Sequence, residues 1–109
     1  MNIQKIIKEE LNEYNGFKQS LQDNIGDLTE LQAIMAPGND ITSFPDSIGN
    51  LINIEFINIH GSNLTYVPDS ISNLDFNNGG YLMVINIGNN AHPKIKQKLE
   101  RLLPNVDIN

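Results

Sequence analysis

The sequence contains no cysteine. This absence excludes disulfide frameworks, thiolate metal sites and cysteine nucleophiles, because each of these needs a thiol. It also means that redox arguments say nothing about the compartment in which the protein works.

Basic residues are few. Seven lysines and arginines stand against 13 aspartates and glutamates, which gives a net charge of −6. A surface of this sign is repelled by phosphate backbones and anionic lipids, so neither nucleic acid nor membrane is expected as a partner. The balance is uneven, since residues 92–109 hold four cations against two carboxylates. We interpret this basic end as a solvated helix face and not as a dedicated site for an acidic ligand.

Long apolar runs are missing as well. Residues 1–10 interrupt their apolar side chains with charges every few positions, which fits neither a signal peptide nor a membrane span. We therefore predict a cytoplasmic protein, in which the sequon at Asn63 is a chance occurrence.

No catalytic motif is present. His60 and His92 are the only histidines, and the sequence has neither a nucleophile elbow nor a glycine-rich phosphate loop. Asp46 and Asp69 recur one period apart after proline, where aspartate commonly caps a turn. Acid/base catalysis needs carboxylates in different environments, whereas a repeat gives them the same one. We predict no enzymatic activity, no cofactor and no metal.

What the sequence does contain is a repeat. Residues 25–47 and 48–70 align at a constant offset of 23 residues, with apolar positions retained and polar ones varied. Such a period is typical of a stacked solenoid. The aligned pairs are Ile25/Ile48, Leu28/Leu51, Leu31/Ile54, Ile34/Ile57, Ala36/Ile59, Ile41/Leu64, Phe44/Val67, Pro45/Pro68 and Asp46/Asp69.

Each unit carries one strand pattern, which reads Leu31-x-x-Ile34-x-Ala36-x-x-Asn39-x-Ile41 in the first unit. Over residues 21–92 this pattern resembles the leucine-rich-repeat (LRR) family, in its typical 23-residue LPxxI subtype of small, bacterial-like proteins. The resemblance implies an α/β fold: a short solenoid with a curved parallel sheet on its concave side. The pattern recurs as Ile54-x-x-Ile57-x-Ile59-x-x-Ser62-x-Leu64 and as Leu82-x-x-Ile85-x-Ile87-x-x-Asn90-x-His92.

The residue after each strand is the second feature that the resemblance implies. In the family an asparagine there bonds to the backbone and forms a ladder along the solenoid. Asn39 and Asn90 match this position, whereas Ser62 replaces it in the middle unit. Serine is too short to make the same bonds, so the ladder is in doubt at that turn.

The third unit is interrupted. The equivalent of Ile57 is Ile85, so five residues are inserted in or near residues 75–80. Their composition is that of a surface loop. Phe76 and Tyr81 either form an interaction site or pack beneath this loop.

The two ends differ from the repeats. Apolar residues at helical spacing predict an amphipathic helical cap over residues 1–20, which would cover the outer side of the first repeat. The alternative for this helix is docking to a partner protein. Over residues 93–109 we predict a capping helix that begins at Pro93 and then a strand that joins the sheet. With the repeats at 21–92, we expect one complete small domain.

The register places three rows of side chains on the concave face. The first row is Ala33, Phe56, Val84 and Asn105, the second is Met35, Asn58, Asn86 and Asp107, and the third is Pro37, His60, Gly88 and Asn109. An exposed aromatic beside amides is typical of a protein-binding patch. The alternative is that Phe56 only packs across the strands and stabilises the sheet. The candidate binding residues are Ala33, Met35, Phe56, Asn58, His60, Val84, Asn86 and Asp107.

These observations favour a non-enzymatic protein-interaction module that binds a protein partner of unknown identity through the concave face. We expect a monomer or a weak homo-oligomer. One alternative is a structural homo-oligomer that pairs through the edge of the terminal strand at residues 106–108. The other is an inhibitor or regulator of an enzyme.

Overall fold

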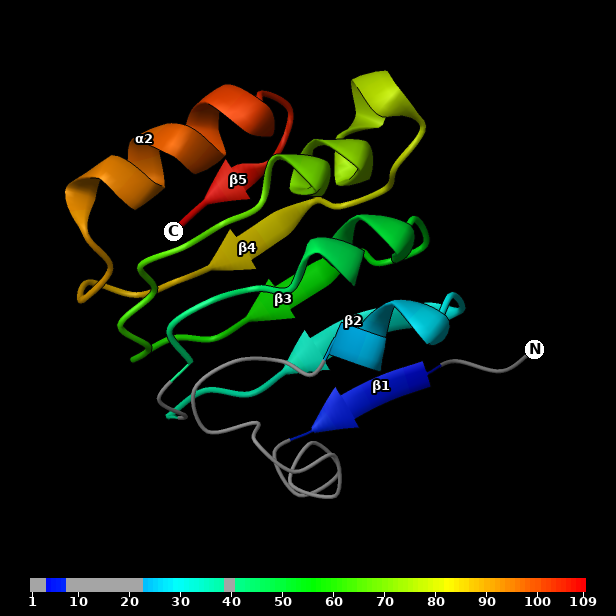
Figure 1. Ribbon diagram of the computed structural model, residues 1–109, viewed down its shortest axis with the longest axis horizontal. Coiled ribbons are helices and arrows are strands. Elements are labelled where there is room, and N and C mark those ends of the chain that lie inside the picture. The colour runs from blue at the N-terminus through cyan, green and yellow to red at the C-terminus, as the bar shows by residue number, and fades with distance from the viewer. Residues whose placement is uncertain (1–3, 8–22, 39–40) are drawn as a thin grey trace.

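A computed structural model of the chain describes residues 4–7, 23–38 and 41–109. The strands form one parallel five-stranded sheet, in sequence order (Figure 1). Short 3-10 helices stack beside one another along the sheet, and one α-helix precedes the last strand (Figure 1). The strands are β1 (Gln4–Ile7), β2 (Leu31–Met35), β3 (Phe56–Asn58), β4 (Val84–Asn86) and β5 (Asp107–Ile108). The helices are η1 (Asp23–Asp27), η2 (Asp46–Asn50), η3 (Asp69–Leu74), η4 (Phe76–Asn78) and α2 (Pro93–Leu102).

The strand register confirms the period and the insertion. Ile34 of β2 lies beside Ile57 of β3, an offset of 23 residues. Ile57 in turn lies beside Ile85 of β4, an offset of 28 residues, so the five additional residues fall between these strands.

One apolar core fills the space between the sheet and the 3-10 helices. The inward strand residues Ile34, Ile57 and Ile85 are fully buried, and so are Ile48 and Ile71 from the helices. Burying each such side chain contributes about 1.5–3 kcal/mol. The helices can be short because each one packs against the helix of the next turn (Figure 1).

The helix predicted for the N-terminal end is wrong over residues 4–7. These residues form β1, which pairs in parallel with β2. The remainder of the predicted cap lies outside the described residues. The reason is the free edge of β2: a strand there satisfies its backbone N–H and C=O groups, which a helix cannot do. Two isoleucines in a short segment fit either structure.

The structure describes two of the three positions of the predicted asparagine ladder. Asn39 lies outside the described residues, and Asn90 is exposed. Ser62 is fully buried, and its Oγ has no hydrogen-bond partner among the described residues. The serine therefore leaves the central turn without the side-chain bond that this position provides in the repeat pattern.

Polar contacts on the helical side link successive turns instead. Asn53 Nδ2 donates to the Thr29 carbonyl at 2.9 Å. Each of the other contacts also spans about one repeat: Thr65 Oγ1 to the Thr42 carbonyl at 3.1 Å, Ser70 Oγ to the Asp46 carbonyl at 2.6 Å, and Asn73 Nδ2 to the Gly49 carbonyl at 3.5 Å. Because a carbonyl acceptor exists in every turn, such bonds do not depend on one residue type.

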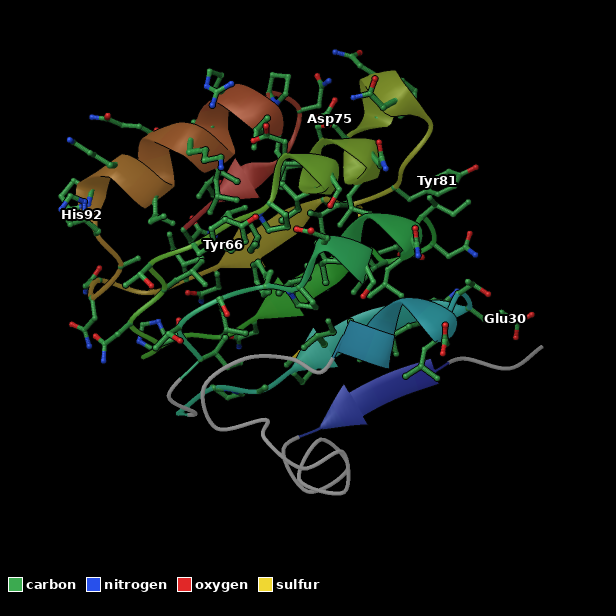
Figure 2. All side chains as sticks on the ribbon, in the orientation of Figure 1. Glu30, Tyr66, Asp75, Tyr81 and His92 are labelled. Atoms are coloured by element: carbon green, nitrogen blue, oxygen red, sulfur yellow. The ribbon has the colours of Figure 1, made fainter. Side chains whose placement is uncertain are left out.

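The C-terminal helix and strand are both confirmed. The helix α2 begins at Pro93, and His92 Nδ1 accepts a hydrogen bond from the Lys94 N–H at 3.1 Å, capping its first turn (Figure 2). Ile95 and Leu99 are buried against the core.

The predicted register of the last strand is wrong by two residues. Asp107 lies beside Val84, where Asn105 was expected, and Ile108 lies beside Ile85. Asn105 instead bonds to the buried Asp75 before the strand starts. Because of these bonds, the chain joins the sheet two residues later than predicted. Asp107 therefore lies in the first row of side chains, beside Val84.

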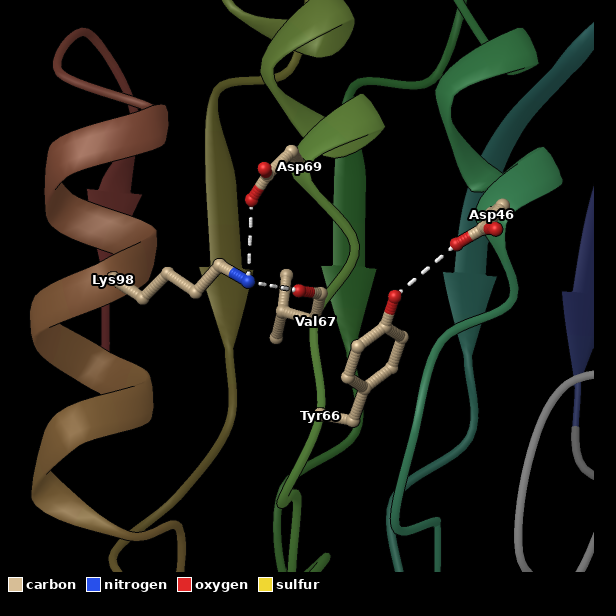
Figure 3. A network of polar contacts seen from close by, with 5 residues as sticks. All are labelled: Asp46, Tyr66, Val67, Asp69 and Lys98. Atoms are coloured by element: carbon tan, nitrogen blue, oxygen red, sulfur yellow. Dashed lines mark hydrogen bonds and ion pairs between the residues drawn. The ribbon is translucent and has the colours of Figure 1, made fainter.

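Lys98 attaches α2 to the repeats (Figure 3). Its Nζ donates to the Val67 carbonyl at 2.6 Å, lies 3.2 Å from an Asp69 carboxylate oxygen and sits 5.7 Å from the centre of the Tyr66 ring. The Tyr66 hydroxyl donates to Asp46 at 3.3 Å. Desolvation and then the charge of Asp46 raise the pKa of Tyr66, which keeps the phenol protonated as a donor.

Replacing Lys98 with alanine is expected to lower the free energy of unfolding by about 1–2 kcal/mol, because the Val67 carbonyl loses a charged donor. The ion pair itself contributes little, since Asp69 is exposed. Urea unfolding measures the difference, with Lys96→Ala as the control because Lys96 is exposed on the same helix. Equal losses in both variants would contradict this role.

Candidate functional site

The sheet face turned away from the core carries most of the predicted binding residues, and we call it the open face. Its first row runs Ala33, Phe56, Val84 and Asp107 across β2 to β5. Its second row runs Met35, Asn58 and Asn86 across β2 to β4. Except for Asp107, which changes rows, these pairings match the register expected from the sequence.

Phe56 occupies the centre of the first row. Its flanking residues, Ala33 and Val84, are partly buried, while Phe56 retains 36% of its exposure. Packing across the strands stabilises the ring but leaves much of it accessible. Phe56 is therefore a partly exposed aromatic ring between two partly buried side chains.

Asn58 and Asn86 of the second row each form an Asx turn at the end of their strand. Asn58 Oδ1 accepts from the His60 N–H at 3.0 Å, and Asn86 Oδ1 accepts from the Gly88 N–H at 3.1 Å. Each amide oxygen thus closes the end of its own strand. The amide nitrogens of Asn58 and Asn86 are hydrogen-bond donors, and these turns do not use them.

His60 extends the second row past β3. Its Nδ1 lies 3.2 Å from Asn86 Oδ1. Because that oxygen already accepts from a backbone N–H, the network assigns the proton to Nδ1 of His60. The other ring nitrogen, Nε2, is an acceptor in that tautomer.

A groove lies next to the open face, at the edge where β3 and β4 begin. It has a volume of about 620 Å³, within the range of ordinary ligand pockets. Its lining combines the insert with the residues that precede three strands: Glu55, Phe76, Tyr81, Leu82, Met83 and Asn105. Figure 2 shows Tyr81 at this edge, on the same side of the molecule as Glu30.

The sequence indicated only part of this groove. Phe76 and Tyr81 were expected either to interact or to pack beneath the loop, and their exposures of 72% and 59% exclude packing. Glu55 and Met83 were not identified, and Asn105 was expected in the first row of the open face. A signal was available for two of them, because Glu55 and Met83 occupy the same position in successive repeats, directly before the first row.

The insert is a compact structure and not an open loop. The Leu82 N–H donates to the Leu74 carbonyl at 3.1 Å, which closes it at its base. Gly79 adopts a left-handed conformation with φ of 88° after η4. A Cβ at Gly80 would collide with the Leu74 backbone. The glycine pair therefore allows the chain to turn and pack closely, which holds Phe76 and Tyr81 at fixed positions.

Asp75 ties the insert to the C-terminal segment. Its buried carboxylate accepts from Asn105 N–H and Nδ2, both at 2.9 Å, and from the Asn77 N–H at 3.0 Å. Burial alone would raise the pKa of Asp75, but the donors of Asn105 and Asn77 outweigh it, so the pKa lies below its usual value. The carboxylate stays charged and joins the two walls of the groove.

The described side chains contain no cluster of three histidine, aspartate or glutamate residues arranged to hold a metal ion. Over the same part of the chain, no helix has the length and apolar character needed to span a bilayer.

Comparison with known proteins shows the fold. No protein-family model matches the chain, and no curated protein matches its sequence. Its structure is similar to that of a leucine-rich-repeat protein of Leptospira interrogans, with a TM-score of 0.72 and 24% sequence identity. The alignment covers 84% of this chain but only 22% of that one. The chain thus has a small α/β fold of the LRR type, while the LPxxI subtype stays a prediction.

Replacing Asp75 with alanine is expected to lower the free energy of unfolding at pH 7 by about 2–3 kcal/mol, because buried donors lose a charged acceptor. The folded-state pKa is lowered, so this stabilisation is complete above the unfolded pKa of about 4 and disappears as pH falls through the folded value. Urea unfolding of both proteins at several pH values measures the difference.

Glu100→Ala is the control for this series, because Glu100 is an exposed carboxylate on α2. Its effect should be small at each pH. A loss in Asp75→Ala that stays constant down to about pH 2 would refute the assignment of the stabilisation to the charged carboxylate.

Proposed function

We propose that this chain is a non-enzymatic protein-interaction module of the LPxxI type, which binds a protein partner through the open face. The observation that carries the proposal is the exposed Phe56, on the same strand face as the donors of Asn58 and Asn86. Binding energy in protein interfaces is concentrated in such aromatic anchors, and flanking hydrogen-bonding groups provide specificity. We further propose that binding takes place in the cytoplasm.

The size of the open face bounds the kind of complex. Two short rows of side chains make a small platform, and interfaces well below the standard area are usually transient. A partner that also contacts the groove would bury a larger area. The resemblance in fold supports recognition only in general terms, since folds host many functions.

The histidines support a recognition role over a catalytic one. His92 caps α2 and His60 bonds to Asn86, so each has a local structural partner. They lie at different places in the fold, one before α2 and one at the end of the second row. We propose no reaction for this chain.

Affinity capture from a lysate of the native host tests the proposal. The double variant Asn58→Arg/Asn86→Arg should lose a protein that the wild-type chain retains, because two bulky charges replace the amides of the second row. Mass spectrometry of the retained proteins identifies the partner. The control is Asn50→Arg/Gln97→Arg, which adds the same charge at exposed positions on the helical side. Loss in the control as well, or retention in both, would contradict binding through the open face.

A second candidate is self-association through the outer edge of β5. Asp107 and Asn109 donate to the Met83 and Ile85 carbonyls of the β4 segment, both at 2.9 Å. In a parallel ladder the N–H and C=O of the residue between them point the other way, so Ile108 presents both groups to the outer edge.

If copies pair through this edge, Ile108→Pro should convert an oligomer to a monomer, because proline has no N–H to donate. Ile108→Ala should not, since it shortens the side chain and keeps that donor. Light scattering after size-exclusion chromatography measures the mass of each. A monomeric wild-type chain at high concentration, or an oligomer that survives proline, would rule out pairing through β5.

A further inference from the structure

The groove continues the open face toward the starts of the strands. Glu55 directly precedes Phe56, and Met83 directly precedes Val84, so two lining residues adjoin the first row. Met83 is 57% exposed, and the aromatic rings of Phe76 and Tyr81 are more exposed still. Three large apolar side chains thus gather around one opening, where scattered single exposure is the norm for a small protein.

One negative charge lies in this apolar lining. Glu55 is partly buried, and no described cation pairs with it. The cationic side chains that the structure describes are Lys94, Lys96, Lys98 and Arg101, all on α2. A second carboxylate, that of Asp107, is exposed at the end of the first row beside Val84. The surface around the groove is therefore both apolar and acidic.

We propose that the groove binds a partner segment that inserts one apolar side chain among Phe76, Tyr81 and Met83 and pairs an adjacent lysine or arginine with Glu55. This inference rests on the proposed function, because it names the chemistry of the same partner. An ion pair at the rim of an apolar site favours a segment of positive charge and fixes the position at which that segment binds. An acidic segment would meet repulsion from Glu55.

The α2 helix of a second copy is a poorer occupant. Of the side chains that the structure describes, the basic ones lie on α2, whose outward positions are Lys94, Lys96, Gln97, Glu100 and Arg101. None of these is a large apolar side chain, so α2 could supply the charge but not the group that fills the groove. The two requirements together exclude α2 as the occupant.

Selection from a phage-displayed library of random dodecapeptides tests the inference. Peptides enriched on the wild-type chain are expected to share an apolar residue next to lysine or arginine. The same peptides, made synthetically, should bind Glu55→Lys and Met83→Asp about ten-fold or more weakly, the loss typical of an interface anchor. Glu100→Lys is the matched control, because it makes the same change of charge on α2 and should bind as the wild type does.

The outcomes separate this inference from the proposed function. Peptides that are lost with Asn58→Arg/Asn86→Arg but bind normally to the groove variants would overturn the groove and leave the open face intact. Selected peptides without enriched basic residues would overturn the pairing with Glu55. Failure to enrich any peptide would also overturn the inference about the groove. It would leave the proposed function untouched, because affinity capture from the lysate tests the open face separately.

Discussion

Each turn of this chain has apolar side chains that only the next turn can cover. Ile34, Ile57 and Ile85 lie in a line across the sheet, and their burial depends on stacking at a matching offset. This requirement explains why the additional residues after Leu74 form a closed insert. The chain must return to the same register before β4, or Ile85 and its neighbours would leave the core. The hydrogen bond between Leu82 and Leu74 accomplishes that return.

Stacking also requires hydrogen bonds between the polar groups of successive turns. The buried Ser62 does not provide them, whereas the contacts of Asn53, Thr65, Ser70 and Asn73 on the helical side do. These bonds tie the turns together on the side away from the open face. The exposed ring of Phe56 and the amide nitrogens of Asn58 and Asn86 take no part in these bonds.

The proposed partner site lies where the repeat is broken. A regular repeat would give every turn the same edge, but the insert adds Phe76 and Tyr81 at one point only. Asp75 holds this insert against Asn105, so the groove has a defined shape. A single buried carboxylate thereby links the last strand, the insert and the surface that we propose binds an apolar and basic segment. Specific recognition by an otherwise repetitive surface requires such a local irregularity.

The sequence by itself determined the features that arise from spacing along the chain. The 23-residue period, the inward and outward strand positions and the helix beginning at Pro93 all follow from local alternation and from proline's fixed geometry. Only the tertiary structure decided the strand at residues 4–7, the register of β5 and the groove. Each of these depends on contacts between distant segments: the free edge of β2 recruits β1, and Asp75 holds a residue 30 positions away. Periodicity specifies which side chains face the core, but it carries no information about which distant polar groups meet at the ends of the stack.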